Sequence, residues 1–178
     1  VSAQTAPVTA DTSGVSAADN YMLNRTAAVP AEVTLRGPTS ELDRISAVVA
    51  PITTDTALAD TTTLPANLEM RDENGTVVTP LYTTMDNGSA NVTLTIYQVR
   101  ELPLSVNFIG TPKGFDVNSL KYTLSQQTLR VAGSARTISA LDTLAVTDFD
   151  LAQEFELDRD YQRLIELPAG VVSLDGAT

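Results

Sequence analysis

The 178-residue sequence contains no cysteine, no histidine and no tryptophan. Without cysteine the chain can form no disulfide bond, thiol nucleophile or thiolate metal site. Without histidine it lacks the usual general base near neutral pH, which excludes Ser-His-Asp and Cys-His catalysis. Any bound metal would have to be a hard cation held by oxygen ligands. These absences remove most common classes of enzyme, so we expect no catalytic residues and no cofactor.

Basic residues are scarce, because 11 lysines and arginines stand against 22 aspartates and glutamates and give a formal net charge of -11. A protein that binds duplex nucleic acid must neutralise phosphates with clustered Lys and Arg. An anionic membrane surface also repels an acidic chain. We therefore expect no nucleic-acid partner and no direct docking on a membrane. Hydrophobic residues make up 43% of the chain, as in soluble globular proteins rather than disordered ones.

Long apolar runs are absent as well. No segment approaches the roughly 18 consecutive apolar residues of a membrane span. The chain begins at Val1 without a methionine, a basic region or an apolar core, so we expect no signal peptide within the given sequence. We expect the sequence to be a fragment of a longer protein.

One pattern occurs twice, 96 positions apart. In each copy an alternating strand ends at a glycine, a Ser/Thr-rich step follows, and a short apolar stripe has helical spacing. The strands are residues 33–36 and 129–131, the glycines are Gly37 and Gly133, and the stripes are Leu42-Ile45-Val48 and Ile138-Leu141-Leu144. The change in hydrophobic period at the glycine predicts a strand–turn–helix unit. Because internal repeats decide the architecture, we predict two modules, residues 7–99 and 102–178.

Other segments support the duplication. Each copy should open on a strand, continue with a second short strand and resume as a strand after the helix. These expected strands are residues 7–13, 21–25 and 47–53 in the first copy and 104–108, 117–122 and 145–151 in the second. Asn74-Gly75 predicts a tight hairpin turn, with Gly170 as its counterpart. The glycine spacing then predicts a seven-residue insertion in the first copy, roughly at residues 80–85. The first copy ends in a good strand, residues 91–97, whereas the second stops where that strand should begin.

The start of each helix makes two further local predictions. Thr39 or Ser40 is expected to cap the first helix, and Ser134 or Thr137 the second. Gly37 and Gly133 should mark corners that need either an unusual φ or a close backbone approach.

The order of these motifs resembles the YbbR domain. The residues that carry the resemblance are the strand entering Arg36-Gly37-Pro38, followed by Ser40-Glu41-Leu42-Asp43-Arg44-Ile45 and an alternating strand. The second copy has Ala132-Gly133-Ser134 at the corner and so departs from the pattern by lacking the proline. The resemblance implies a mainly β fold of two tandem YbbR-like modules, each made of intertwined antiparallel strands with one short helix.

The resemblance also implies a biological setting. Such repeats typically follow one N-terminal membrane helix, lie outside the cytoplasmic membrane of Gram-positive bacteria, and belong to regulators of a membrane-bound diadenylate cyclase. Membrane contact is therefore expected only through a segment absent from this chain. The expected function is therefore non-enzymatic regulation of cyclic di-AMP signalling, through binding of a protein or an envelope component. No catalytic residues are carried over. A passive cell-envelope stalk or adhesion module is the alternative without a signalling role.

One acidic run invites a different interpretation. Its six carboxylates are Asp148, Asp150, Glu154, Glu156, Asp158 and Asp160. In an extended segment they would share one face, and Asp148, Asp150, Glu156 and Asp158 are candidate Ca²⁺ ligands of a cell-wall-binding protein. The run lacks the loop glycine and the spacing of an EF-hand. A solvated face, with Arg159 and Arg163 as counterions, is the simpler prediction, and we expect no metal. A hydrolase that uses a carboxylate pair on sugars is poorly supported, because the chain has few aromatic residues for stacking.

Overall fold

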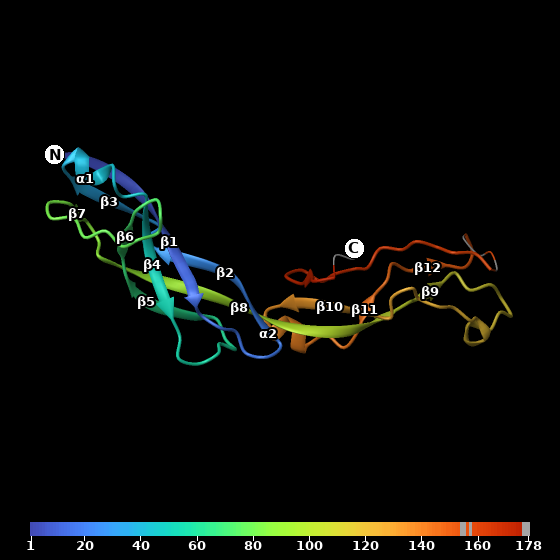
Figure 1. The fold of residues 1–178 in the computed structure, drawn as a ribbon. Coiled ribbons are helices and arrows are strands. Elements are labelled where there is room, and N and C mark those ends of the chain that lie inside the picture. Colours follow the sequence, from blue (N-terminus) through green and yellow to red (C-terminus); the bar gives the residue numbers. More distant parts are fainter. Residues whose placement is uncertain (154–155, 157, 176–178) are drawn as a thin grey trace. The chain divides into compact units, whose positions relative to one another are not determined.

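The computed structural model describes residues 1–153, 156 and 158–175 (Figure 1). The chain divides into two compact units, Val1–Tyr97 (unit 1) and Gln98–Thr178 (unit 2). Strands dominate, and the described residues contain two short α-helices, α1 (Thr39–Leu42) and α2 (Ala135–Ser139). The prediction of a mainly β fold with one short helix in each half is confirmed.

Strand β1 (Ser2–Gly14) lies at the centre of unit 1. Its first half pairs antiparallel with β3 (Glu32–Gly37), and its second half pairs in parallel with β4 (Ala47–Thr53). The outer strands are β6 (Glu69–Arg71) beside β4 and β7 (Thr84–Met85) beside β3, which gives the order β6-β4-β1-β3-β7. Figure 1 shows β1 running beside both partners.

A second group of strands completes the hydrophobic core of unit 1. Strand β5 (Thr62–Asn67) pairs antiparallel with the beginning of β8 (Ser89–Ser105), and β2 (Tyr21–Val29) also pairs with β8. Alternate residues of β8 point into the core, because side chains of a strand alternate between its two faces. The buried positions of this part of β8 are Ala90, Val92, Leu94 and Ile96. The first three join Val33, Leu35 and Val48 from the other strands in one core.

The described residues of unit 2 contain the remainder of β8 and five shorter strands. The end of β8 pairs antiparallel with β10 (Thr128–Gly133) and in parallel with β11 (Leu144–Ala145). Strand β13 (Val172–Ser173) lies beside β10, and β9 (Phe108–Ile109) pairs with β12 (Phe149–Asp150). Its core consists of Leu102, Leu129, Val131, Ile138, Leu144 and Val171.

The strand registers of the two units correspond at the spacing seen in the sequence. The six β1–β3 pairs, from Ser2–Gly37 to Pro7–Glu32, match six β8–β10 pairs, from Gln98–Gly133 to Pro103–Thr128. Every residue of one set lies 96 positions from its counterpart in the other. The parallel pair Val8–Val48 corresponds in the same way to Leu104–Leu144. The buried residue of each helix also obeys the spacing, as Leu42 in α1 and Ile138 in α2.

The predicted insertion lies between a glycine turn and the following strand. Gly75 and Gly170 adopt nearly the same positive φ, 79° and 80°. Nine positions then separate Gly75 from Thr84, which pairs with Arg36 in β3. Only two positions separate Gly170 from Val172, which pairs with Ala132 in β10. Unit 1 therefore has seven extra residues in this connection.

Some local predictions are wrong. The chain at 117–122 forms the short 3-10 helix η1 (Val117–Ser119) instead of a strand. The Asp116 carboxylate accepts the Asn118 N–H at 3.0 Å, and the Ser119 hydroxyl donates to the Asp116 carbonyl at 2.6 Å. Such local side-chain bonds compete with a strand ladder for the backbone groups.

Of the two predicted helix caps, only the cap of α2 is correct. Pro38 occupies the N-cap of α1, without a side-chain hydrogen bond, and the Thr39 hydroxyl bonds instead to Ser2 at 3.1 Å. Ser134 does cap α2, since its hydroxyl accepts the Thr137 N–H at 3.3 Å.

The corner glycines are explained by close approach rather than by unusual φ. A Cβ on Gly37 would lie 2.9 Å from the Cα of Thr83, and one on Gly133 would lie 2.9 Å from the carbonyl oxygen of Gly170. Real Cβ atoms essentially never come this close to backbone atoms. The chain just before β7 in unit 1, and just before β13 in unit 2, passes directly over the corner, so only glycine fits there.

Replacing either corner glycine should therefore destabilise the protein. We expect Gly37→Ala and Gly133→Ala each to lower the free energy of unfolding by about 1–3 kcal/mol, as overpacking of a tight site usually does. Gly88→Ala is the control, because nothing lies within 4 Å of a Cβ there, and it should change the free energy by less than about 0.5 kcal/mol. Urea denaturation measures all three. Equal midpoints for Gly37→Ala and Gly88→Ala would contradict the close approach.

Candidate functional site

The insertion in unit 1 begins with a tight turn that the sequence builds well. Asp72 closes it, since its carboxylate accepts the N–H groups of Asn74 and Thr76, both at 2.9 Å. Gly75 supplies the positive φ that an Asn-Gly turn requires. The returning chain then bonds to β6 through the Val78 N–H and the Met70 carbonyl at 2.8 Å. The turn thereby directs the next residues toward α1.

Residues 77–83, which we call the crossing loop, pass over α1 and are held there by one carboxylate. Glu41 accepts the N–H of Leu81 at 3.3 Å, the N–H of Tyr82 at 3.1 Å and the hydroxyl of Thr83 at 2.7 Å. Thr83 is buried over the corner glycine of β3, with 7% of its surface exposed. Glu41 is available at this place because α1 starts immediately after that corner.

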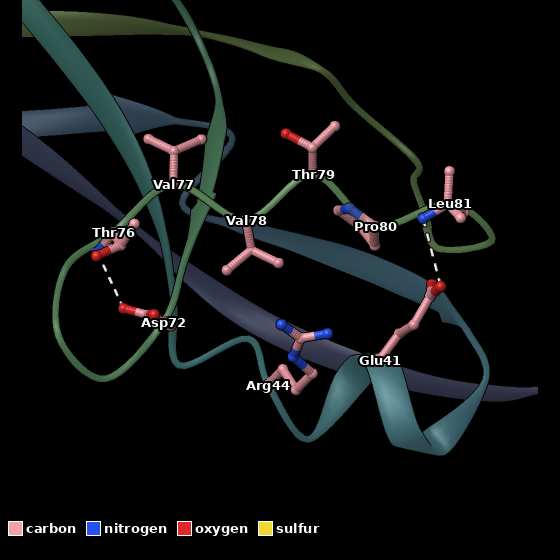
Figure 2. A pocket seen from close by; sticks show the side chains of 9 residues that line it. All are labelled: Glu41, Arg44, Asp72, Thr76, Val77, Val78, Thr79, Pro80 and Leu81. Carbon is pink, nitrogen blue, oxygen red and sulfur yellow. Dashed lines mark hydrogen bonds between the residues drawn. The ribbon is translucent and has the colours of Figure 1, made fainter.

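Beside the crossing loop lie two open hollows that share part of their lining. The first has a volume of about 370 Å³ and is lined by Glu41, Arg44, Asp72 and residues 76–81. In Figure 2, Arg44 lies between Glu41 and Asp72, and Val78 points toward it. The second, of about 490 Å³, continues past Arg44 along Asp43–Ser46 and Asp72–Asn74. Both are shallow surface depressions.

The crossing loop exposes large apolar side chains. Leu81 has 84% of its surface exposed, Tyr82 has 74% and Val77 has 52%. Leu81 and Tyr82 directly precede the anchored Thr83, so their apolar groups face solvent from a segment whose backbone is fixed. These apolar side chains carry no reactive group. The arrangement is suited to making contacts with another molecule.

Several carboxylates of unit 1 titrate below their ordinary range. The pKa of Glu41 is lowered from 4.5, first by the Thr83 hydroxyl and then by the loop N–H groups. The pKa of Asp86 is lowered from 3.8, chiefly by the Thr34 N–H, which it accepts at 2.9 Å. The pKa of Asp11 is lowered from 3.8 by hydrogen bonds from Ser13 and then by Arg71. Each of these carboxylates thus stabilises the fold in its charged form.

Arg71 also links two strands of unit 1. Its guanidinium binds Glu69 at 3.0 Å and Asp11 at 3.1 Å, and all three side chains are only partly exposed. The Arg71–Asp11 pair connects β6 to β1 across β4, which lies between them. It holds the hairpin that leads into the crossing loop.

The acidic run proposed from the sequence as a Ca²⁺ face is not one extended segment. Phe149–Asp150 is a strand, but residues 151–153 form a turn, and Glu154 lies outside the described residues. Asp148 accepts the Asn107 side-chain amide at 3.0 Å, and Asp150 accepts the Ala152 N–H at 2.9 Å.

The other two candidate ligands have different surroundings. Glu156 pairs with Arg159 at 2.5 Å, and Asp158 has a positive φ of 58°. Arg163, expected as a second counterion, packs over the rings of Phe149 and Tyr161. In the part of the chain that the structure describes, no three acidic residues are grouped so that they could hold a metal ion.

Comparison with known proteins identifies the family. The family model of the YbbR-like proteins matches residues 6–96, about half of the chain. The chain therefore belongs to the YbbR-like family, as the resemblance of its Arg-Gly-Pro corner and following helix predicted.

Comparisons with individual proteins add little to the family assignment. The crystal structure of a YbbR-like protein from Streptococcus pneumoniae TIGR4 matches with a TM-score of 0.44 and 16% identity, over 53% of this chain and 47% of that chain. The match thus spans less than half of that protein. No curated protein matches the sequence. No described helix has the length and apolar character needed to cross a membrane.

Sequence reasoning located the insertion but missed its anchor. The residues that matter at the crossing loop are Glu41, Leu81 and Tyr82, and none was singled out. The adjacent pair Leu81-Tyr82 inside a segment that only the first copy contains was the available signal. The hydrogen bonds that Glu41 accepts join residues about 40 positions apart, and no local pattern encodes them.

Loss of the Glu41 charge should loosen the crossing loop. We expect Glu41→Gln to raise the amide hydrogen-exchange rates of Leu81 and Tyr82 on the order of tenfold, because charge-assisted hydrogen bonds become neutral ones. The matched control is Glu73→Gln, since Glu73 lines the second hollow but, unlike Glu41, accepts no hydrogen bond from Leu81, Tyr82 or Thr83. Exchange measured by NMR should be unchanged in the control. Similar rates in both variants would show that Glu41 does not hold the loop.

Unit 1 should lose stability in acid. The carboxyls of Glu41, Asp86 and Asp11 have folded-state pKa values below their ordinary 4.5 and 3.8, so the unfolded chain binds more protons at low pH. Their contribution is complete above about pH 4.5 and is lost as the pH falls through the lowered values. Melting temperatures from pH 7 to pH 3 should fall below about pH 4.5, and less so in Glu41→Gln. A melting temperature that stays level or rises in acid would contradict this assignment.

Proposed function

We propose that this chain is a non-enzymatic, extracytoplasmic segment of a membrane-anchored protein that regulates a membrane-bound diadenylate cyclase. The observation that carries the proposal is membership of the YbbR-like family across residues 6–96, together with the setting that the resemblance implies. The sequence supports a non-enzymatic role, because it lacks the histidine and cysteine on which most general-base and nucleophilic catalysis depends.

Unit 2 is, in this proposal, a second YbbR module in tandem with the first. Support comes from the registers, since pairs of β1 with β3 and β4 have counterparts in β8, β10 and β11 at a constant spacing of 96 residues. The shared helix position and the two matching corner glycines point the same way. Tandem modules offer several surfaces on one chain, which suits a protein that receives a signal by binding.

Regulation would then proceed by contact. A partner protein or an envelope component binds the modules, and the differential binding free energy shifts the membrane-bound complex between states. The anchor is an N-terminal membrane helix outside this sequence. The part of the chain that fits this role best is the crossing loop, because it presents exposed apolar side chains on a fixed backbone.

The test is co-purification of the cyclase with the full-length anchored protein. Detergent extracts of cells that express a tagged protein should yield the cyclase, and deletion of residues 1–178 should abolish its recovery. The control replaces the same residues with a flexible Gly/Ser linker, so that the anchor and tag remain. If the linker variant recovers as much cyclase as the intact protein, the two units act as a passive stalk. If no cyclase is recovered with the intact protein, the proposed regulatory function is refuted.

A further inference from the structure

The crossing loop carries a feature that the β-fold of unit 1 does not require. In unit 2 the connection from Gly170 to Val172 is short, yet β13 still pairs with β10. Unit 1 pairs β7 with β3 at the same place and has seven more residues in the connection. Because the shorter connection suffices for the same pairing, the extra residues need another explanation.

The exposed side chains of the insertion supply one. We propose that Leu81 and Tyr82 form a docking surface for a basic surface of a partner protein that offers an apolar pocket. This inference deepens the proposed function and rests on it for the identity of the partner. Exposed apolar groups that cluster rather than scatter mark interaction sites, and Tyr is enriched among the residues that dominate binding energy.

The backbone of the surface is already ordered. Three hydrogen bonds from Leu81, Tyr82 and Thr83 to the Glu41 carboxylate fix the tip, and Thr83 is packed against Gly37. A segment that is ordered before binding loses less conformational freedom when a partner arrives. The anchor therefore explains how a short, exposed loop could bind with useful affinity.

The charge around the loop selects the kind of partner. The two hollows beside it are lined by one guanidinium, that of Arg44, and by four carboxylates, those of Glu41, Asp43, Asp72 and Glu73. The whole chain carries a formal charge of -11. An anionic membrane would repel such a surface, and so would a second copy of the chain. A basic protein surface is complementary to it.

The experiment uses the full-length protein and the same co-purification. The test variant is Leu81→Ser with Tyr82→Ser, which removes the apolar contacts but leaves the Glu41 bonds to the loop backbone possible. Leu164→Ser is the matched control, because Leu164 is 68% exposed in unit 2. A third variant, Asp43→Asn with Glu73→Gln, removes two charges that make no hydrogen bond to the loop. Melting temperatures check that all variants fold.

The double serine variant should reduce recovered cyclase about tenfold or more, as loss of dominant contacts does. The control should retain it, and the charge variant should reduce recovery most clearly at low salt. Cyclase recovered with the intact protein and equally with the double variant would overturn the docking surface alone. No recovery with the intact protein would overturn the proposed function and, with it, this partner. Co-sedimentation of residues 1–178 with phosphatidylglycerol vesicles, lost in the double variant, would also overturn it in favour of a lipid.

Discussion

The pairing of β1 with a strand on each side is the constraint on which unit 1 depends. Its first half pairs antiparallel with β3 and its second half in parallel with β4. The register places Gly37 opposite Ser2, at the end of β3, where the chain turns into α1. The position of α1 in turn sets where Glu41 lies. A slip of one residue would reverse which side chains face the core, so the register fixes the site as well as the fold.

From that corner the local structure follows step by step. Thr83 can pass over β3 only because position 37 has no side chain. Once Thr83 is there, its hydroxyl and the preceding N–H groups meet the carboxylate on α1. The tip of the crossing loop is therefore ordered by groups that the fold already places, and its apolar side chains remain in solvent. In our proposal, this loop adds a binding surface to the module without altering its core.

Much of the fold was predictable because the strongest signals are local and periodic. Alternation in 33–36 and 129–131 identified β3 and β10, and the 96-residue spacing anticipated their corresponding registers. The Asn-Gly pair identified the hairpin turn. Prediction failed at 117–122, where Asp116 and Ser119 bond to nearby backbone, and at the α1 cap, where Pro38 took the place expected for a hydroxyl. The long-range anchor of the crossing loop was not predictable, since a single glutamate on a helix of four residues has many possible partners.

The central claim is the register of β1 against β3. It can be tested directly with introduced cysteines, because the chain has no cysteine of its own. Thr5 pairs with Thr34, and the Thr34 N–H and carbonyl bond to Asp86 on the β7 side. Thr5 and Thr34 are therefore a non-hydrogen-bonded pair, whose side chains approach most closely. Under mild oxidation, cysteines at positions 5 and 34 should form a disulfide in the folded protein, and cysteines at 5 and 36 should not. A disulfide in the 5–36 protein but none in the 5–34 protein would contradict the register and everything built on it.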